Sequence, residues 1–139
     1  MTLYKLIDHT ADLGMEVTGR TKRELFTKAA LSLMDIVVER KGTPSGLQEK
    51  ALTIEGSDPA DLLINFLREI LYLFNAEAVI IGKCEITKCG NKTLDARLWL
   101  EPYNKKKHVM KTEIKAVTYH GLSVERIKNG WRAGVIFDV

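Results

Sequence analysis

The sequence has few cysteines and prolines and few aromatic residues. Its 139 residues include 2 Cys and 3 Pro, and aromatic residues make up 7%. Two cysteines are too few to hold together a disulfide-stapled fold. Cys84 and Cys89 lie five residues apart, so strand alternation points them to opposite faces, and their neighbours form no zinc-binding pattern. We expect two unbridged thiols.

The sequence also lacks a long hydrophobic run and a strong excess of one charge. The apolar stretch 62–74 is interrupted by Asn65, Arg68 and Glu69, and residues 1–5 contain no hydrophobic signal core. We therefore expect no membrane span and no export, hence a cytoplasmic protein. The net charge of +3, from 21 basic and 18 acidic residues, is too small to favour nucleic-acid binding by bulk electrostatics. Any contact with RNA would have to be local.

Recognised catalytic motifs are missing as well. The sequence contains no glycine-rich phosphate loop, no serine elbow and no HExxH motif, which leaves nucleotide binding and hydrolysis by those routes unsupported. A content of 45% hydrophobic and 28% charged residues is typical of an ordinary globular protein. The length is that of one domain, so we expect a single domain over residues 1–139.

Periodicity predicts an α+β fold. Helical spacing appears from Thr21 to about Val38 and again from Asp58 onward, and strand patterns occupy the rest of the chain. The expected strands cover residues 3–7, 13–18, 51–56, 79–88, 93–100, 111–119, 122–127 and 131–139, with turns at Gly90-Asn91, His120-Gly121 and Asn129-Gly130. We expect two helices packed on a mostly antiparallel sheet of about seven or eight strands.

Both helices have recognisable starts. Residues 21–24 read as a capping box with Thr21 and Glu24 as its two polar members. Asp58 precedes Pro59, which places an N-cap residue before proline at the first helical position. The second helix carries a broad apolar surface made of Leu62, Leu63, Phe66, Leu67, Ile70, Leu71 and Phe74. Such a surface predicts a helix at the centre of the core.

An acidic cluster marks the junction of the first two strands, where the sequence reads Asp8-His9-Thr10-Ala11-Asp12. Carboxylate oxygens suit Mg, Mn and Ca, and imidazole admits softer ions, so a divalent-metal site is one interpretation. The other is a turn in which Asp8 caps backbone amides and Asp12 is solvated. His9 could be a core histidine bonded to the backbone, a metal ligand, or a group that orients Asp12.

A second acidic position lies at the end of the last strand. Trp131, Ala133, Val135 and Phe137 share one face by alternation, so Asp138 points to the other. If the strands of Asp12 and Asp138 are neighbours, two carboxylates converge at one rim, and the carboxylate of Val139 lies within a residue of them. Such oxygens repel one another unless a cation neutralises them. The alternative is a solvated residue near a chain end.

Basic residues cluster between the predicted strands 93–100 and 111–119. Lys105, Lys106 and Lys107 precede His108, and Lys115 lies beyond them. Such a run usually forms a solvated loop, and it could also contact phosphate or an acidic partner.

Several sequence blocks together resemble the archease family. They are Asp8 to Gly14, Glu24-Leu25-Phe26 with Ala29-Ala30, Asp61-Leu62-Leu63, Glu113 to His120, and the ending Trp131, Ala133 and Val135 to Val139. The match follows the family's order over nearly the whole chain. The resemblance implies an archease-like fold and an accessory protein rather than an enzyme.

The family resemblance also implies a partner and a site. Archeases assist the RtcB-type RNA ligase in tRNA splicing by promoting its metal-dependent guanylylation and multiple turnover. The family's metal-binding acidic residues fall on Asp12 and Asp138 with Val139 beside them, for an ion that could be Ca, Mg or Mn. A chaperone-like modulator of a tRNA methyltransferase and a direct tRNA- or RNA-binding module remain the alternatives.

Overall fold

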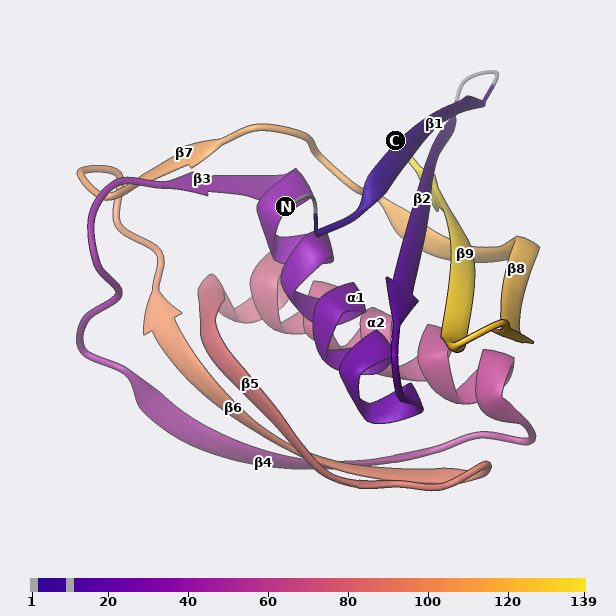
Figure 1. The fold of residues 1–139 in the computed structure, drawn as a ribbon. Helices are drawn as coiled ribbons and strands as arrows, with labels where there is room; N and C mark the ends of the chain where they lie inside the picture. Colours follow the sequence, from indigo (N-terminus) through magenta and orange to yellow (C-terminus); the bar gives the residue numbers. More distant parts are fainter. Residues whose placement is uncertain (1–2, 10–11) are drawn as a thin grey trace.

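Two helices and a set of antiparallel strands make up the protein (Figure 1). The computed structural model describes residues 3–9 and 12–139. The elements are β1 (Lys5–His9), β2 (Asp12–Gly19), α1 (Lys22–Val37), β3 (Val38–Arg40), β4 (Gln48–Glu55), α2 (Pro59–Glu77), β5 (Val79–Cys89), β6 (Thr93–Pro102), β7 (His108–Met110), β8 (Ala116–Ile127) and β9 (Gly130–Asp138). The predicted α+β class, with two helices packed on antiparallel strands, is confirmed.

The strands divide among three sheets. The described residues form nine strands, in the orders β1-β2-β9-β8, β3-β7 and β4-β6-β5, and every pairing is antiparallel. The helices lie between the two larger sheets (Figure 1), with α1 contacting β2 and β5 and α2 contacting β8. The sequence pattern did not indicate β3 and β7, because strands of three residues are too short to show alternation.

Helix α2 lies at the centre of the core, as predicted. Asp58 caps it by accepting a hydrogen bond from the Asp61 amide at 2.8 Å, and Pro59 occupies its first turn. The buried residues of α2 are Leu62, Leu63, Ile64, Phe66, Leu67, Ile70, Leu71, Leu73 and Phe74. This helix therefore contributes apolar surface in more than one direction, which lets a sheet pack on either side of it.

The start of α1 is capped and tethered. The Thr21 hydroxyl accepts from the Glu24 amide at 3.1 Å, while the Glu24 carboxylate pairs with Lys28 Nζ at 3.0 Å. Lys22 Nζ donates to the Gly90 carbonyl at 3.1 Å and to Asn91 Oδ1 at 2.6 Å. The basic residue that opens α1 thus fixes this helix to the turn between β5 and β6.

One predicted turn is wrong. His120 and Gly121 lie inside the continuous strand β8, where the pairing with β9 shifts register between Thr118 and Ser123. Gly121 has φ +67°, and a Cβ at this position would stand 2.6 Å from Ile136 Cδ1. A glycine in this conformation marks a bulge as readily as a turn, and the sequence alone does not separate the two. The predicted Asn129-Gly130 turn is confirmed, with Asn129 at φ 67°.

The cysteines are free thiols, as expected. Both lie on β5 and are partly buried. Burial raises the pKa of Cys84 to about 12 and also raises the pKa of Cys89, which keeps both thiols protonated and unreactive at neutral pH. Neither helix of the described part of the chain combines the length and hydrophobicity needed to cross a membrane.

Asp58→Ala tests the cap of α2. The substitution removes the side-chain acceptor of the Asp61 amide, so we expect the free energy of unfolding to fall by about 1 kcal/mol in urea denaturation. Asn75→Ala is the control, because Asn75 is exposed on the same helix, and it should change stability by less than about 0.5 kcal/mol. Equal effects of the two substitutions would contradict the capping role.

Candidate functional site

The pairing of β2 with β9 places Asp12 directly opposite Asp138. In the same register Met15 faces Val135 and Val17 faces Ala133, and these four side chains are buried. Alternation then puts Asp12 and Asp138 together on the outer face of the sheet. The predicted neighbouring of the two strands is confirmed, and two carboxylates from distant parts of the sequence share one rim.

The rim is the edge of the four-stranded sheet at which Asp12 and Asp138 lie, and it extends across all four strands. The backbone of His9 pairs with Asp12 on one side, and Ala116 pairs with Asp138 on the other. The Lys115 amide donates to the Asp138 carbonyl at 2.7 Å, and the Lys115 side chain is exposed. The side chains of Asp8 and His9 lie outside what the structure describes, so their proposed supporting role stays a prediction.

A shallow depression adjoins the rim. It has a volume of about 250 Å³ and is lined by Tyr4, Leu6, Asp12, Leu13, Ile36, Lys111, Thr112 and Val139. Tyr4 donates to Asp35 Oδ2 at 2.6 Å, and burial together with this bond raises the pKa of Tyr4 to about 12. Lys111 Nζ donates to the Asp35 carbonyl at 2.7 Å. The wall of the depression is therefore fixed by hydrogen bonds, while Leu6 and Val139 remain 50% and 40% exposed.

The chemistry of the rim suits a hard cation. Two carboxylates and the main-chain oxygens of Val139 are oxygen donors, which Ca, Mg and Mn prefer. Among the side chains that the structure describes, no three of His, Cys, Asp and Glu gather as a metal-binding group. Asp12 and Asp138 would therefore supply only part of a coordination sphere, and water or a partner protein would supply the remainder.

The basic loop between β6 and β7 lies apart from this rim, at the left edge of Figure 1, whereas the C-terminus lies near the top middle. Lys105 and Lys106 are exposed. Lys107 is engaged within the protein, because its Nζ donates to Glu101 Oε2 at 2.9 Å and to Ser45 Oγ at 2.5 Å. The predicted contact role thus has two exposed candidates in the loop, and Lys115 is the one predicted lysine that lies at the rim.

His108 differs from the expectation of a solvated loop, because only 2% of it is exposed. The Asn104 amide donates to His108 Nδ1 at 2.9 Å, so the proton of the neutral ring sits on Nε2 and is donated to Glu101 Oε1, 2.6 Å away. Burial alone would raise the pKa of Glu101, but hydrogen bonds from the Ser45 amide, Lys107 and His108 outweigh it and lower this pKa to about 2. The cluster anchors the loop.

The sequence carried no clear signal for this cluster. Alternation along 93–100 placed Glu101 on the polar face of its strand, yet Leu100 and Glu101 are both buried where β6 ends. A buried carboxylate requires partners. Its partners are Ser45 in the loop after β3, Lys107 in the loop before β7 and His108 at the start of β7. Neither loop could be placed from its composition.

Comparison with known proteins settles the family. The model of the Archease protein family matches residues 4–139. The chain belongs to the archease family. Protein archease of Thermococcus kodakarensis is 35% identical over 145 residues, and protein archease of Pyrococcus furiosus is 34% identical over 143 residues, each comparison covering 100% of both chains. The resemblance seen in the sequence is confirmed.

Two solved structures share this archease fold. A Methanobacterium thermoautotrophicum protein solved in solution is 26% identical, with a TM-score of 0.77 and 100% of both chains covered. An archease of Thermotoga maritima, described as a possible chaperone, is 27% identical, with a TM-score of 0.66 and 97% of this chain and 96% of that chain covered. The arrangement of two helices between antiparallel sheets is therefore that of archeases.

Glu101→Gln tests the buried cluster. The substitution replaces the carboxylate oxygen that accepts from Ser45 and Lys107 with an NH2 group, which accepts from neither. We therefore expect the free energy of unfolding at neutral pH to fall by roughly 3 kcal/mol. In the wild type, the pKa of Glu101 is lowered from 4.5 to about 2, so its stabilising effect is complete above pH 4.5 and is lost as the pH falls toward 2. Urea unfolding across this range should show a weaker pH dependence in the variant.

Glu49→Gln is the matched control for this measurement. Glu49 is exposed and lies 3.5 Å from Arg97 Nε, so its substitution should change stability by less than about 1 kcal/mol. If Glu101→Gln unfolded with the wild-type free energy and the wild-type pH dependence, the anchoring role of the cluster would be refuted.

Proposed function

We propose that this archease is an accessory protein of an RtcB-type RNA ligase in tRNA splicing. It promotes the metal-dependent guanylylation of the ligase and sustains multiple turnover, acts in the cytoplasm, and is not an enzyme by itself. Membership of the archease family supports the accessory role. The observation that carries the proposal is the register of β2 and β9, which sets Asp12 opposite Asp138 at an accessible rim.

The chemistry explains why such a rim would help. Guanylyl transfer requires the charge of the triphosphate to be neutralised and its leaving group to be oriented, and a divalent ion supplies both. Asp12 and Asp138 would hold such an ion, with Val139 beside them. Because they provide only part of a coordination sphere, oxygens of the ligase could complete it. Lys115, at the same rim, would face the ligase or a phosphate group, while Lys105 and Lys106 are more distant contact candidates.

Two other function classes remain distinguishable by one assay. A free-standing enzyme would turn over GTP or RNA without ligase, and an RNA-binding module would shift RNA mobility alone with a steep salt dependence. A third outcome is chaperone-like action on a tRNA methyltransferase, the alternative that the family resemblance implies. The Thermotoga maritima archease is described as a possible chaperone. The accessory role predicts no activity alone and stimulation of the ligase at well below equal stoichiometry.

Asp12→Ala is the variant that tests the site. It removes one of the two paired carboxylates from the outer face of the sheet, opposite the buried face that carries Met15 and Val17, so the fold should survive while stimulation of ligase guanylylation is abolished. The measurement is labelled guanylyl transfer from GTP to the ligase, with and without the accessory protein. Asp138→Ala should behave in the same way.

Glu125→Gln serves as the control in this assay. Glu125 is an exposed carboxylate in β8, paired with Arg132 at 2.6 Å and remote from the rim along the sheet. This variant should stimulate like the wild type. Full stimulation by Asp12→Ala would remove the proposed role of the rim, and stimulation of a methyltransferase but not of the ligase would replace the proposed partner.

A further inference from the structure

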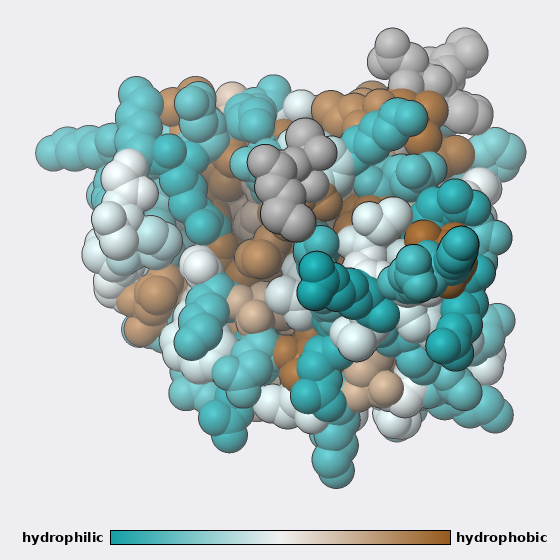
Figure 2. All heavy atoms as spheres, viewed as in Figure 1, coloured by the Kyte–Doolittle hydropathy of each residue, from teal (hydrophilic) through white to brown (hydrophobic). Residues whose placement is uncertain are grey.

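A second cavity lies between α1, β3 and β5. Its volume is about 420 Å³, and it is lined by Leu3, Leu31, Met34, Asp35, Val38, Glu39, Arg40, Ile81 and Gly82. It shares no lining residue with the depression beside Asp12. A volume of this size accommodates a small organic molecule. Figure 2 shows hydrophobic side chains gathered in the middle of the face that carries α1 and β3.

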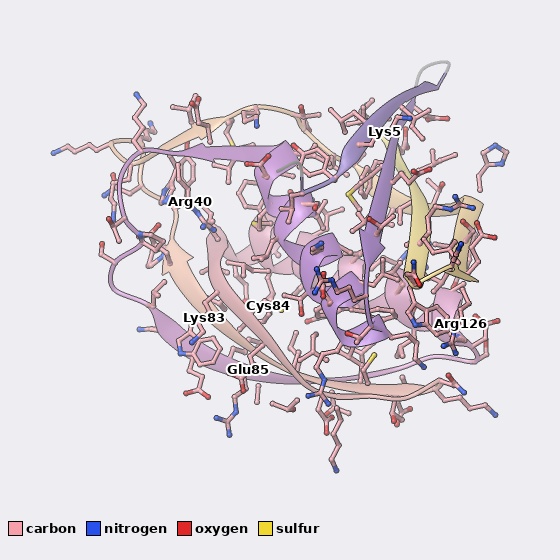
Figure 3. The ribbon with its side chains drawn as sticks, in the orientation of Figure 1. Lys5, Arg40, Lys83, Cys84, Glu85 and Arg126 are labelled. Carbon is pink, nitrogen blue, oxygen red and sulfur yellow. The ribbon has the colours of Figure 1, made fainter. Side chains whose placement is uncertain are left out.

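Arg40 brings a charge into this cavity. Its side chain reaches from β3 into the space between that strand and the ends of β5 and β6 (Figure 3). The backbone of Arg40 pairs with His108, which fixes the residue in place. Within the described part of the chain, its guanidinium makes no hydrogen bond and no ion pair, and it is partly buried. Arg40 thus lines the cavity with five N–H donors for which the described residues supply no acceptor.

The two carboxylates whose charges act on Arg40 accept hydrogen bonds from other residues. Glu101 accepts hydrogen bonds from the Ser45 amide, Lys107 and His108, and Asp35 accepts from Tyr4. Burial lowers the pKa of Arg40, and the charges of Glu101 and Asp35 oppose that shift without forming a bond to it. An acceptor that entered the cavity would therefore gain charge-assisted hydrogen bonds that the protein itself does not make.

The walls define what else an occupant must carry. Leu31, Met34, Val38 and Ile81 supply aliphatic surface, and the last three are at most 3% exposed. Asp35 and Glu39 also line the cavity, so any anion meets two negative charges beside the single guanidinium, and this repulsion is about twice as large for a doubly charged phosphate as for a singly charged carboxylate. We propose that this cavity binds a small organic monocarboxylate with a branched aliphatic body, its carboxylate on Arg40 and its body against α1, β3 and Ile81.

Isovalerate is the probe for this proposal. Its carboxylate and branched chain match the two features, while isoamyl alcohol has the same body without the charge and inorganic phosphate has charge without the body. We expect isovalerate to shift the methyl signals of Val38 and Ile81 and the side-chain signal of Arg40 saturably in an NMR titration of the full chain. Isoamyl alcohol, which loses the charge-assisted pair, and phosphate, which lacks the apolar body, should each bind at least about tenfold more weakly.

Arg40→Met tests the charge while keeping an unbranched side chain. Because Arg40 makes no bond that folding depends on, the variant should unfold like the wild type and bind isovalerate at least about tenfold more weakly. Arg40→Lys keeps the charge but cannot form two parallel hydrogen bonds to a carboxylate. Its affinity for isovalerate should lie between those of the wild type and Arg40→Met. Lys41→Met is the control, because Lys41 is the next residue, is exposed and does not line the cavity.

Three outcomes would overturn the proposal. One is the absence of saturable shifts with isovalerate. Another is equal binding of isovalerate and isoamyl alcohol, which would make the cavity a purely apolar site. The third is tighter binding of phosphate than of isovalerate, which would assign the site to a different ligand. Because the cavity and the rim share no residue, none of these outcomes bears on the proposed ligase function.

Discussion

The antiparallel pairing of β2 with β9 is the constraint on which the other features depend. It runs from Asp12 opposite Asp138 to Gly19 opposite Trp131. A slip of one residue would move Met15 and Phe137 from the core to solvent. The burial of one face therefore fixes the register, and the register in turn brings the two carboxylates together on the other face. Fold stability and the candidate site depend on the same contact.

Buried and exposed polar groups play different parts in this protein. Glu101 and His108 are buried and fully bonded, so they fix the loop that carries Lys105 and Lys106. Asp12 and Asp138 lie opposite each other at the rim. Among the described side chains, no third His, Cys, Asp or Glu joins them to complete a metal-binding group. Arg40 lies between these cases, since it is partly buried and its guanidinium has no hydrogen bond or ion pair with a described residue. The first group holds the structure together, and we propose that the others bind partners or ligands.

Alternation and capping residues allowed most of the fold to be predicted. The paired apolar faces of β2 and β9, the Asp58 cap and the Asn129-Gly130 turn were all visible in the sequence, because each depends on nearby residues. The division into three sheets was not predicted, because it depends on contacts between distant short strands. The bulge at Gly121 and the burial of His108 were missed for a similar reason, since Ile136 and Glu101 decide them. The convergence of Asp12 and Asp138 could be predicted from the alternation of residues along their strands. The cavity at Arg40 could not, because it lies between elements that are distant in the sequence.

We propose that the register of β2 and β9 creates a site for a divalent ion. Paramagnetic Mn²⁺, added in small amounts to the free protein, broadens the NMR signals of nuclei close to its binding site. We expect selective broadening of the amide signals at Asp12, Asp138, Val139 and the adjoining Lys115, and loss of that broadening when both Asp12 and Asp138 are replaced by alanine. Broadening centred elsewhere, or unchanged in the double variant, would contradict it.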